Sequence, residues 1–215
     1  MEFIDKELDD YIVAHSAKES QLLEQLNRDT WTNVILPRML SGRLQGRVLS
    51  MLSHMIKPRR ILEIGTYTGY SAICLAEGMT SDGIIHTIDI NEELAEMVRS
   101  YFAEARLSEK SKCHIGNAME IIPTLNEEWD LVFIDADKDN YSNYFDLVID
   151  KMNKGGFIIA DNVLWSGKVL EKNREKKIDK DTKAIMDFND KVHQDDRMEN
   201  VLFPIRDGLM VLRKL

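Results

Sequence analysis

Two short apolar runs, separated by the length of one helix, constrain this chain more than any other feature. Residues 131–134 and 157–160 are each suited to one buried strand. Between them, apolar side chains recur at helical spacing at Tyr141, Tyr144, Phe145, Val148 and Met152. The pattern predicts a strand–helix–strand unit with parallel strands and a right-handed crossover, and therefore an α/β fold.

Both predicted strands end in a polar cluster. Asp135 and Asp137 follow the first strand, and Asp161 and Asn162 follow the second. Because open α/β sheets bind ligands at the carboxyl ends of their strands, we expect Asp135, Asp161 and Asn162 to present oxygen atoms to one point. Such donors suit Mg²⁺, Ca²⁺ or Mn²⁺ better than zinc. Lys138 stands one short turn beyond the first of these residues.

A glycine loop follows an earlier apolar strand, predicted at residues 60–64. Gly65 and Gly69 bracket this loop, and Ser71 lies where the next helix opens. A glycine turn at a helix start lets a ligand approach the backbone closely, although a tight turn without a ligand has the same pattern. Glu63 favours a cationic ligand there, since a carboxylate repels phosphate. A sulfonium with an amino group therefore fits better than a pyrophosphate.

The remaining strands suggest where a nucleoside and the sheet edge would lie. The second predicted strand ends in Asp89, the usual place of an acid that binds a ribose hydroxyl, although an acid that contacts only solvent is the alternative. After a third strand at residues 112–115, Ala118 begins a helix against which an adenine ring could lie. Residues 201–203 and 209–212 predict a closing antiparallel pair.

The N-terminal residues 1–56 are predicted to be helical and precede the first strand. We expect a single domain over residues 1–215, with a helical cap at 1–56 and an α/β core at 57–215. The cap has two interpretations: a layer packed on the domain or a partner subunit, and a lid over a substrate. Met39 and Ser41, after the break at Pro37, are the candidate lid residues.

Composition narrows the functional classes. No apolar run approaches the roughly 20 residues that a membrane span requires. A formal net charge of −9 argues against a broad nucleic-acid-binding face. Cys74 and Cys113 lie in apolar stretches without CxxC spacing, so we expect two reduced core thiols, no zinc site and a cytoplasmic protein.

Five motifs, taken in order, resemble those of a known family. ILEIGTYTGYS, IHTIDI, GNA, FIDADKDNY and IIADNVLWSG are similar to motifs of the divalent-metal-dependent, S-adenosylmethionine-dependent O-methyltransferases, which include caffeoyl-coenzyme A and catechol O-methyltransferases and their bacterial relatives. The resemblance covers roughly residues 37–213, and FIDADK with ADNVLW is its specific part. It implies a class I methyltransferase fold, with a Rossmann-like seven-stranded sheet and a reversed last strand, and a homodimer.

The resemblance also implies roles for individual residues. The S-adenosylmethionine site would contain Ser41, Glu63, Gly65, Thr66, Ser71, Asp89, Ala118 and Asp137. The metal ligands would be Asp135, Asp161 and Asn162, and Lys138 would be the catalytic base. The acceptor pocket would be lined by Met39, Asp135, Trp165 and Ser166. Two positions depart from relatives: Asn117 stands where Asp is frequent, and Ser166 where plant enzymes carry Asn, which weakens the case for a coenzyme A thioester.

The expected reaction is metal-assisted methyl transfer to a hydroxyl of a small catechol-like phenol. One alternative keeps the reaction but methylates 5-hydroxyuridine in transfer RNA; the arginines that favour it are Arg38, Arg43, Arg47, Arg59 and Arg60. A dinucleotide-dependent oxidoreductase and a binding protein without catalysis are two further hypotheses. The glycine-loop spacing and the Asp/Asp/Asn cluster oppose the oxidoreductase.

Overall fold

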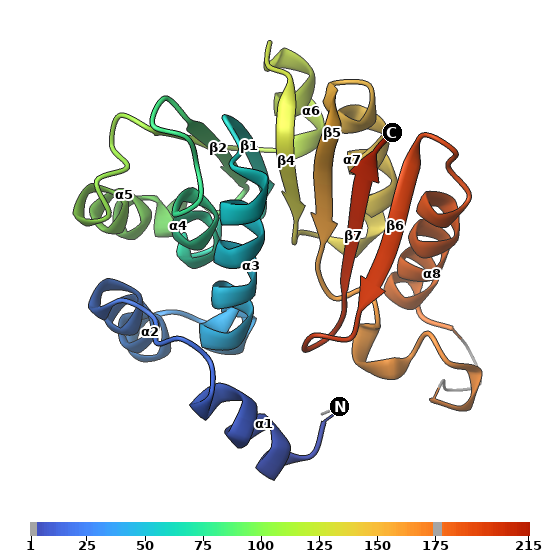
Figure 1. Ribbon diagram of the computed structural model, residues 1–215, viewed down its shortest axis with the longest axis horizontal. Coiled ribbons are helices and arrows are strands. Elements are labelled where there is room, and N and C mark those ends of the chain that lie inside the picture. Colours follow the sequence, from blue (N-terminus) through green and yellow to red (C-terminus); the bar gives the residue numbers. More distant parts are fainter. Residues whose placement is uncertain (1–3, 174–177) are drawn as a thin grey trace.

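The computed structural model describes residues 4–173 and 178–215. Its strands are β1 (Arg60–Ile64), β2 (Ile84–Asp89), β3 (Ser111–Ile115), β4 (Trp129–Ile134), β5 (Met152–Ala160), β6 (Met198–Phe203) and β7 (Leu209–Lys214). They form one seven-stranded sheet in the order β3-β2-β1-β4-β5-β7-β6 (Figure 1). Only β7 is antiparallel to its neighbours, β5 and β6. The predicted α/β class, with a seven-stranded sheet and a reversed last strand, is confirmed.

Helices cover both faces of this sheet (Figure 1). The α-helices are α1 (Lys6–Ala14), α2 (Gln21–Asn33), α3 (Gly42–Ile56), α4 (Tyr70–Ala76), α5 (Ala95–Glu104), α6 (Ala118–Thr124), α7 (Tyr141–Ile149) and α8 (Lys180–His193). The short 3-10 helices are η1 (Pro37–Met39), η2 (Glu92–Leu94), η3 (Lys138–Asn140), η4 (Trp165–Gly167) and η5 (Glu171–Asn173). None of the helices within the described ranges has the length and apolarity to cross a membrane.

The sheet separates two apolar cores because successive side chains of a strand point to opposite faces. In β1, Ile61 belongs to the core that contains Leu49 of α3 and Phe102 of α5. Its neighbour Leu62 belongs to the other core, which includes Phe145 of α7. Burial on both faces explains why the inner strands are continuous apolar runs rather than alternating ones.

The N-terminal helices predicted from the sequence are present. Pro37 starts η1 and separates α2 from α3, and Leu36 before it has a left-handed backbone with φ 60°. α3 packs against α4, where the Ser53 hydroxyl donates to the Leu75 carbonyl at 2.5 Å. The N-terminal layer is thus fixed to the first helix after the glycine loop.

The cysteine prediction is half wrong. Cys74, on α4, is a buried free thiol as expected. Cys113 is free but exposed, because β3 is the outermost strand on its side of the sheet and leaves much of its surface to solvent. An apolar stretch therefore did not reveal that this strand lies at an edge.

Gly65 is required where β1 and β4 end side by side. Its φ is 105°, and a Cβ atom there would lie 1.9 Å from the Asp135 carbonyl oxygen. Gly155 also has a positive φ, 81°, but nothing lies within 4 Å of its Cβ position. The two glycines therefore share the backbone requirement and differ in available space.

We expect Gly65→Ala to lower the free energy of unfolding by at least about 2 kcal/mol more than Gly155→Ala, because both incur the left-handed backbone cost but only Gly65→Ala forces two strand ends apart. Urea denaturation followed by circular dichroism measures both values. Equal losses in the two variants would contradict the close approach.

Candidate active site

The two acidic clusters meet at the carboxyl ends of β4 and β5. These strands are parallel neighbours, with Ile134 paired to Ala160. The Asp135 amide donates to the Ile64 carbonyl and the Asp161 amide to the Ile134 carbonyl, each at 2.9 Å. The backbone hydrogen bonds of the sheet therefore place both carboxylates beside the point where strand order changes from β1 to β4, the ligand-binding edge of such sheets.

Asp161 is only 3% exposed. Its Oδ1 accepts from the Asn162 amide at 2.7 Å and its Oδ2 from Gln45 Nε2 at 2.6 Å. Burial, and then the nearby charge of Asp135, raise the pKa of Asp161 above its ordinary value. Two neighbouring carboxylates, one of them buried, favour the approach of a positive charge.

Lys138 supplies part of that charge. Its Nζ lies 3.1 Å from Asp135 Oδ1 and donates to the Tyr141 hydroxyl at 2.6 Å. Burial raises the pKa of Tyr141 well above its ordinary value, so the phenol stays neutral and donates onward to the Asp161 carbonyl at 3.1 Å. Lys138 is thus held in a fixed place at the base of the site.

The donor set fits a hard divalent cation. The Asn162 side-chain amide makes no hydrogen bond within residues 4–173 and 178–215, and its φ of 60° turns the backbone sharply after β5. Within those ranges no group of three or more His, Cys, Asp or Glu residues could hold a metal. Two carboxylates and one amide therefore constitute the candidate set, which suits Mg²⁺, Ca²⁺ or Mn²⁺ with water completing the coordination.

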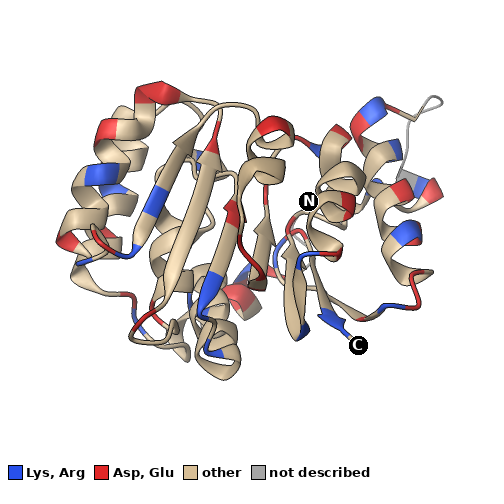
Figure 2. Ribbon diagram, turned by 90° about the horizontal axis from the view of Figure 1, so that it is seen from above, with Lys and Arg blue, Asp and Glu red and all other residues tan. Residues whose placement is uncertain are grey.

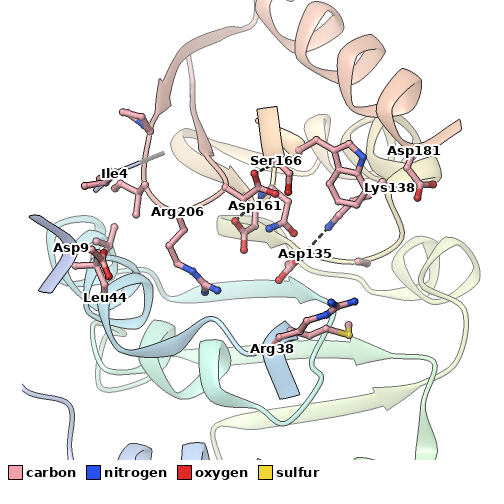
Figure 3. Close-up of a pocket in the computed structure, with 18 of the residues that line it drawn as sticks. Ile4, Asp9, Arg38, Leu44, Asp135, Lys138, Asp161, Ser166, Asp181 and Arg206 are labelled. Atoms are coloured by element: carbon pink, nitrogen blue, oxygen red, sulfur yellow. Dashed lines mark hydrogen bonds and ion pairs between the residues drawn. The ribbon is translucent and has the colours of Figure 1, made fainter. Parts of the chain in front are cut away.

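A pocket of about 1250 Å³ opens over these residues (Figure 3). The predicted residues that line it are Met39, Asp135, Asp137, Lys138, Asp161, Asn162, Trp165 and Ser166. Residues of α1, η1, α3 and the β6–β7 turn complete the wall. The metal-ligand candidates, the candidate base and the candidate acceptor residues are therefore in one cavity, as the sequence predicted.

One wall of the pocket is held in an unusual backbone conformation. Trp165 and Ser166 have φ values of 48° and 52°, which few residues other than glycine adopt. The Ser166 amide donates to Asp207 Oδ1 at 2.5 Å, and the Leu164 amide to the Asp207 carbonyl at 2.8 Å. Asp207 therefore fixes the loop that presents Trp165 to the cavity.

The residues expected to bind the methyl donor, S-adenosylmethionine, do not all line one cavity. Glu63 is buried and accepts from Ser71 Oγ at 2.6 Å and Thr87 Oγ1 at 2.5 Å. Glu63 lines neither the large pocket nor the small cavity beside Asp89. Burial raises the pKa of Glu63 to about 8, which favours the protonated form at neutral pH. Thr66 and Asp89 line a separate cavity of about 10 Å³, which has room for no more than a water molecule.

The other residues expected to bind S-adenosylmethionine are Ala118, Ser41, Asp137 and Gly65. Ala118 is buried at the start of α6, and Ser41 is buried just before α3. Asp137 is exposed at the mouth of the large pocket, where it accepts from the Tyr144 hydroxyl at 2.5 Å. Gly65 lies against Asp135, as described above.

Four residues at the site were not predicted from the sequence: Gln45, Tyr141, Arg206 and Asp207. Tyr141 had been assigned only to the apolar face of a helix. The other three come from segments without a recognisable motif, and Gln45 and Asp161 are 116 positions apart in sequence. A polar residue at a buried position of α3 was the one available signal for Gln45.

A sequence model described as O-methyltransferase matches residues 13–215. The chain belongs to the O-methyltransferase family. The predicted family, the S-adenosylmethionine-dependent O-methyltransferases of the caffeoyl-coenzyme A type, and the predicted enzyme class are therefore confirmed. The oxidoreductase alternative is not supported.

Individual relatives agree with this assignment. Caffeoyl-CoA O-methyltransferase 5 of Nicotiana tabacum is 33% identical over 82% of this chain and 78% of its own length. An O-methyltransferase from Bacillus cereus, solved with SAH, superposes with a TM-score of 0.88 at 28% identity, covering 97% of each chain. TomG from Streptomyces achromogenes, solved with SAM and involved in tomaymycin synthesis, has a TM-score of 0.86 at 28% identity, covering 97% of this chain and 96% of its own.

The partly buried ion pair between Lys138 and Asp135 is expected to contribute to stability. In metal-free protein, Lys138→Met is expected to lower the free energy of unfolding by about 2 kcal/mol, because the side chains of Lys138 and Asp135 are only 10% and 24% exposed and Asp135 would lose its cation. Urea denaturation in the presence of a chelator measures the loss.

The matched control is Lys183→Met, which removes a Lys–Asp pair on α8 whose side chains are 68% and 57% exposed. Its loss should stay below about 0.5 kcal/mol. If both variants lose the same amount, the Lys138–Asp135 pair does not stabilise the site.

Proposed function

We propose that this protein transfers the methyl group of S-adenosylmethionine to a hydroxyl of a small catechol-like phenol, with the help of a divalent cation. The observation that carries the proposal is that Asp135, Asp161, Asn162 and Lys138 line one pocket, with Lys138 Nζ 3.1 Å from Asp135 Oδ1. Family membership supports methyl transfer to oxygen, and the oxygen-donor set supports the cation, with Mg²⁺ as the expected ion.

The donor is supported by the relatives solved with SAM and SAH. Asp89 is assigned to the ribose: its two oxygens accept from the Tyr67 amide at 2.6 Å and the Asn91 amide at 2.9 Å. A carboxylate has about four lone-pair sites, so Asp89 retains capacity for a ribose hydroxyl. The neighbouring Gly65 and Gly69 have φ values of 105° and 83° and set the turn of this loop, and their missing side chains leave room for Asp135 and Phe102.

The acceptor needs activation, because a phenol with a pKa near 10 is only about one part in a thousand ionised at pH 7. When bound, the cation would stabilise the acceptor oxyanion as a Lewis acid. We assign Lys138 as the base: its Nζ, which lines the pocket 3.1 Å from Asp135, would take the acceptor's proton as the neutral amine, once the bound cation replaces it as the counter-charge of Asp135. Trp165 and Met39, on opposite segments, would orient the ring.

The transfer RNA alternative has less support. Arg47, Arg59 and Arg60 form ion pairs with Glu77, Asp82 and Glu127, respectively. Acidic residues are interspersed with basic ones over the helices (Figure 2). The net charge of −9 points the same way. A small acceptor therefore remains the proposal.

A turnover screen tests the function. We expect methyl transfer from S-adenosylmethionine to caffeate or a simple catechol in the presence of Mg²⁺, and little to a caffeoyl thioester or to undermodified transfer RNA. A chelator should abolish turnover and Mg²⁺ should restore it. Asp161→Ala should lower turnover by about 100-fold or more, because a group that supports developing charge is lost.

Asp187→Ala, on the exposed face of α8, is the control and should retain wild-type turnover. Full activity in chelator would remove the cation from the proposal. Preferential methylation of transfer RNA would replace the acceptor while leaving the methyl transfer intact.

We also propose the homodimer implied by family resemblance. Trp31, in the last turn of α2, and Ile35 and Leu36, between α2 and η1, expose large apolar side chains. Such groups commonly mark protein interfaces. Light scattering should give twice the chain mass of 24.8 kDa, and Ile35→Lys should shift the protein toward monomer if this segment is the interface. A wild-type monomer would refute the dimer.

We also propose a cytoplasmic location, which the two free cysteines fit.

A further inference from the structure

Arg206 connects two distant parts of the pocket wall. It lies on the turn between β6 and β7 and lines the pocket near Asp161 (Figure 3). Its Nη1 donates to the carbonyls of Leu40, at 3.2 Å, and Ser41, just before α3. The φ of Arg206 is 50°, a conformation that glycine adopts at less cost. A turn that carries arginine in this conformation points to a use for the side chain.

Gln45 continues this connection to Asp161. Its side chain, on α3, is completely buried. Gln45 Oε1 accepts from Arg206 Nη1 at 3.3 Å, and Gln45 Nε2 donates to Asp161 Oδ2 at 2.6 Å. The three side chains form a continuous path from the β6–β7 turn to the end of β5.

The chemistry of these groups fixes the direction of the path. A guanidinium can only donate hydrogen bonds, so the carbonyl oxygen of the Gln45 amide has to face Arg206. The amide nitrogen then faces Asp161 and donates to it. The Asp161 carboxylate can only accept, so it selects the same orientation of the amide. Arg206 fixes the Gln45 side chain from its other end, and through Gln45 it holds Asp161 Oδ2 in place.

We propose that Arg206 and Gln45 are positioning residues that orient Asp161 toward the divalent cation. The inference rests on the proposed metal-dependent function, and it assigns a role to two residues outside the recognised motifs. Groups that orient a metal ligand typically change metal affinity by about 10–100-fold when removed. The same contacts join the Leu40–Ser41 segment to the turn, so the N-terminal wall of the pocket and the metal ligand depend on one side chain.

Mn²⁺ binding to the metal-free full-length chain tests this role without turnover. We expect Arg206→Met and Gln45→Leu to weaken Mn²⁺ binding by about 10-fold or more, measured by electron paramagnetic resonance. Arg206→Lys, which keeps a donor, should recover most of the affinity. Arg213→Met removes an exposed pair with Glu199 on the same hairpin and should leave affinity unchanged. Saturating Mg²⁺ should restore kcat in Arg206→Met, because the defect lies in metal binding.

The outcomes separate the two proposals. If the wild-type protein binds no Mn²⁺, the metal-dependent function fails and this inference fails with it. If the wild type binds Mn²⁺ and Arg206→Met binds it equally well, the positioning role is overturned while the proposed function stands. Arg206 is exposed, so its variants are expected to fold even if Gln45→Leu does not. An unfolding midpoint measured for each variant identifies any general loss of structure.

Discussion

The carboxylates of Asp135, which is partly exposed, and Asp161, which is buried, are held at neighbouring strand ends, and the site is organised around that constraint. Each follows a strand whose backbone is hydrogen-bonded to its neighbour, so separating the two charges would break the sheet. Repulsion between like charges is strong where water is excluded. Lys138 and Gln45 offset part of it through contacts at 3.1 and 2.6 Å. Charge balance, and not only resemblance, therefore supports a cation at this place.

The parts of the site that lie next to strands were predictable from sequence. An apolar run followed by acidic residues predicts both the strand and the position of the acids at its end, and the structure places Asp135, Asp161 and Asn162 in one pocket. Gly65 was predicted from a similar pattern, a strand followed by a glycine loop, but as a place where a ligand approaches the backbone; the structure places the Asp135 carbonyl there. In each case one local pattern contained both the element and the site.

The parts that depend on contacts between distant segments were not predictable. Gln45 is one polar residue on a helix whose neighbours are ordinary core residues, and Arg206 is one arginine in a turn; no spacing links either to Asp161. Cys113 was misjudged for the same reason, since only the strand order shows that β3 is an edge. Glu63 was predicted as a charged contact for the donor, but its burial under Ser71 and Thr87 depends on packing that local sequence does not reveal.

The contrast between strand ends and loops also explains why the family identifies the reaction better than the acceptor. Asp135 and Asp161 are held at the strand ends by backbone hydrogen bonds, and Lys138, in η3, is held by Asp135 and Tyr141. The acceptor pocket is closed by η1, by the loop around Trp165 and by the β6–β7 turn, which meet through Arg206 and Asp207. Substitutions in these segments can reshape the pocket without moving β4 or β5. Acceptor choice can therefore diverge among relatives while the carboxylate pair and its charge requirement remain the same.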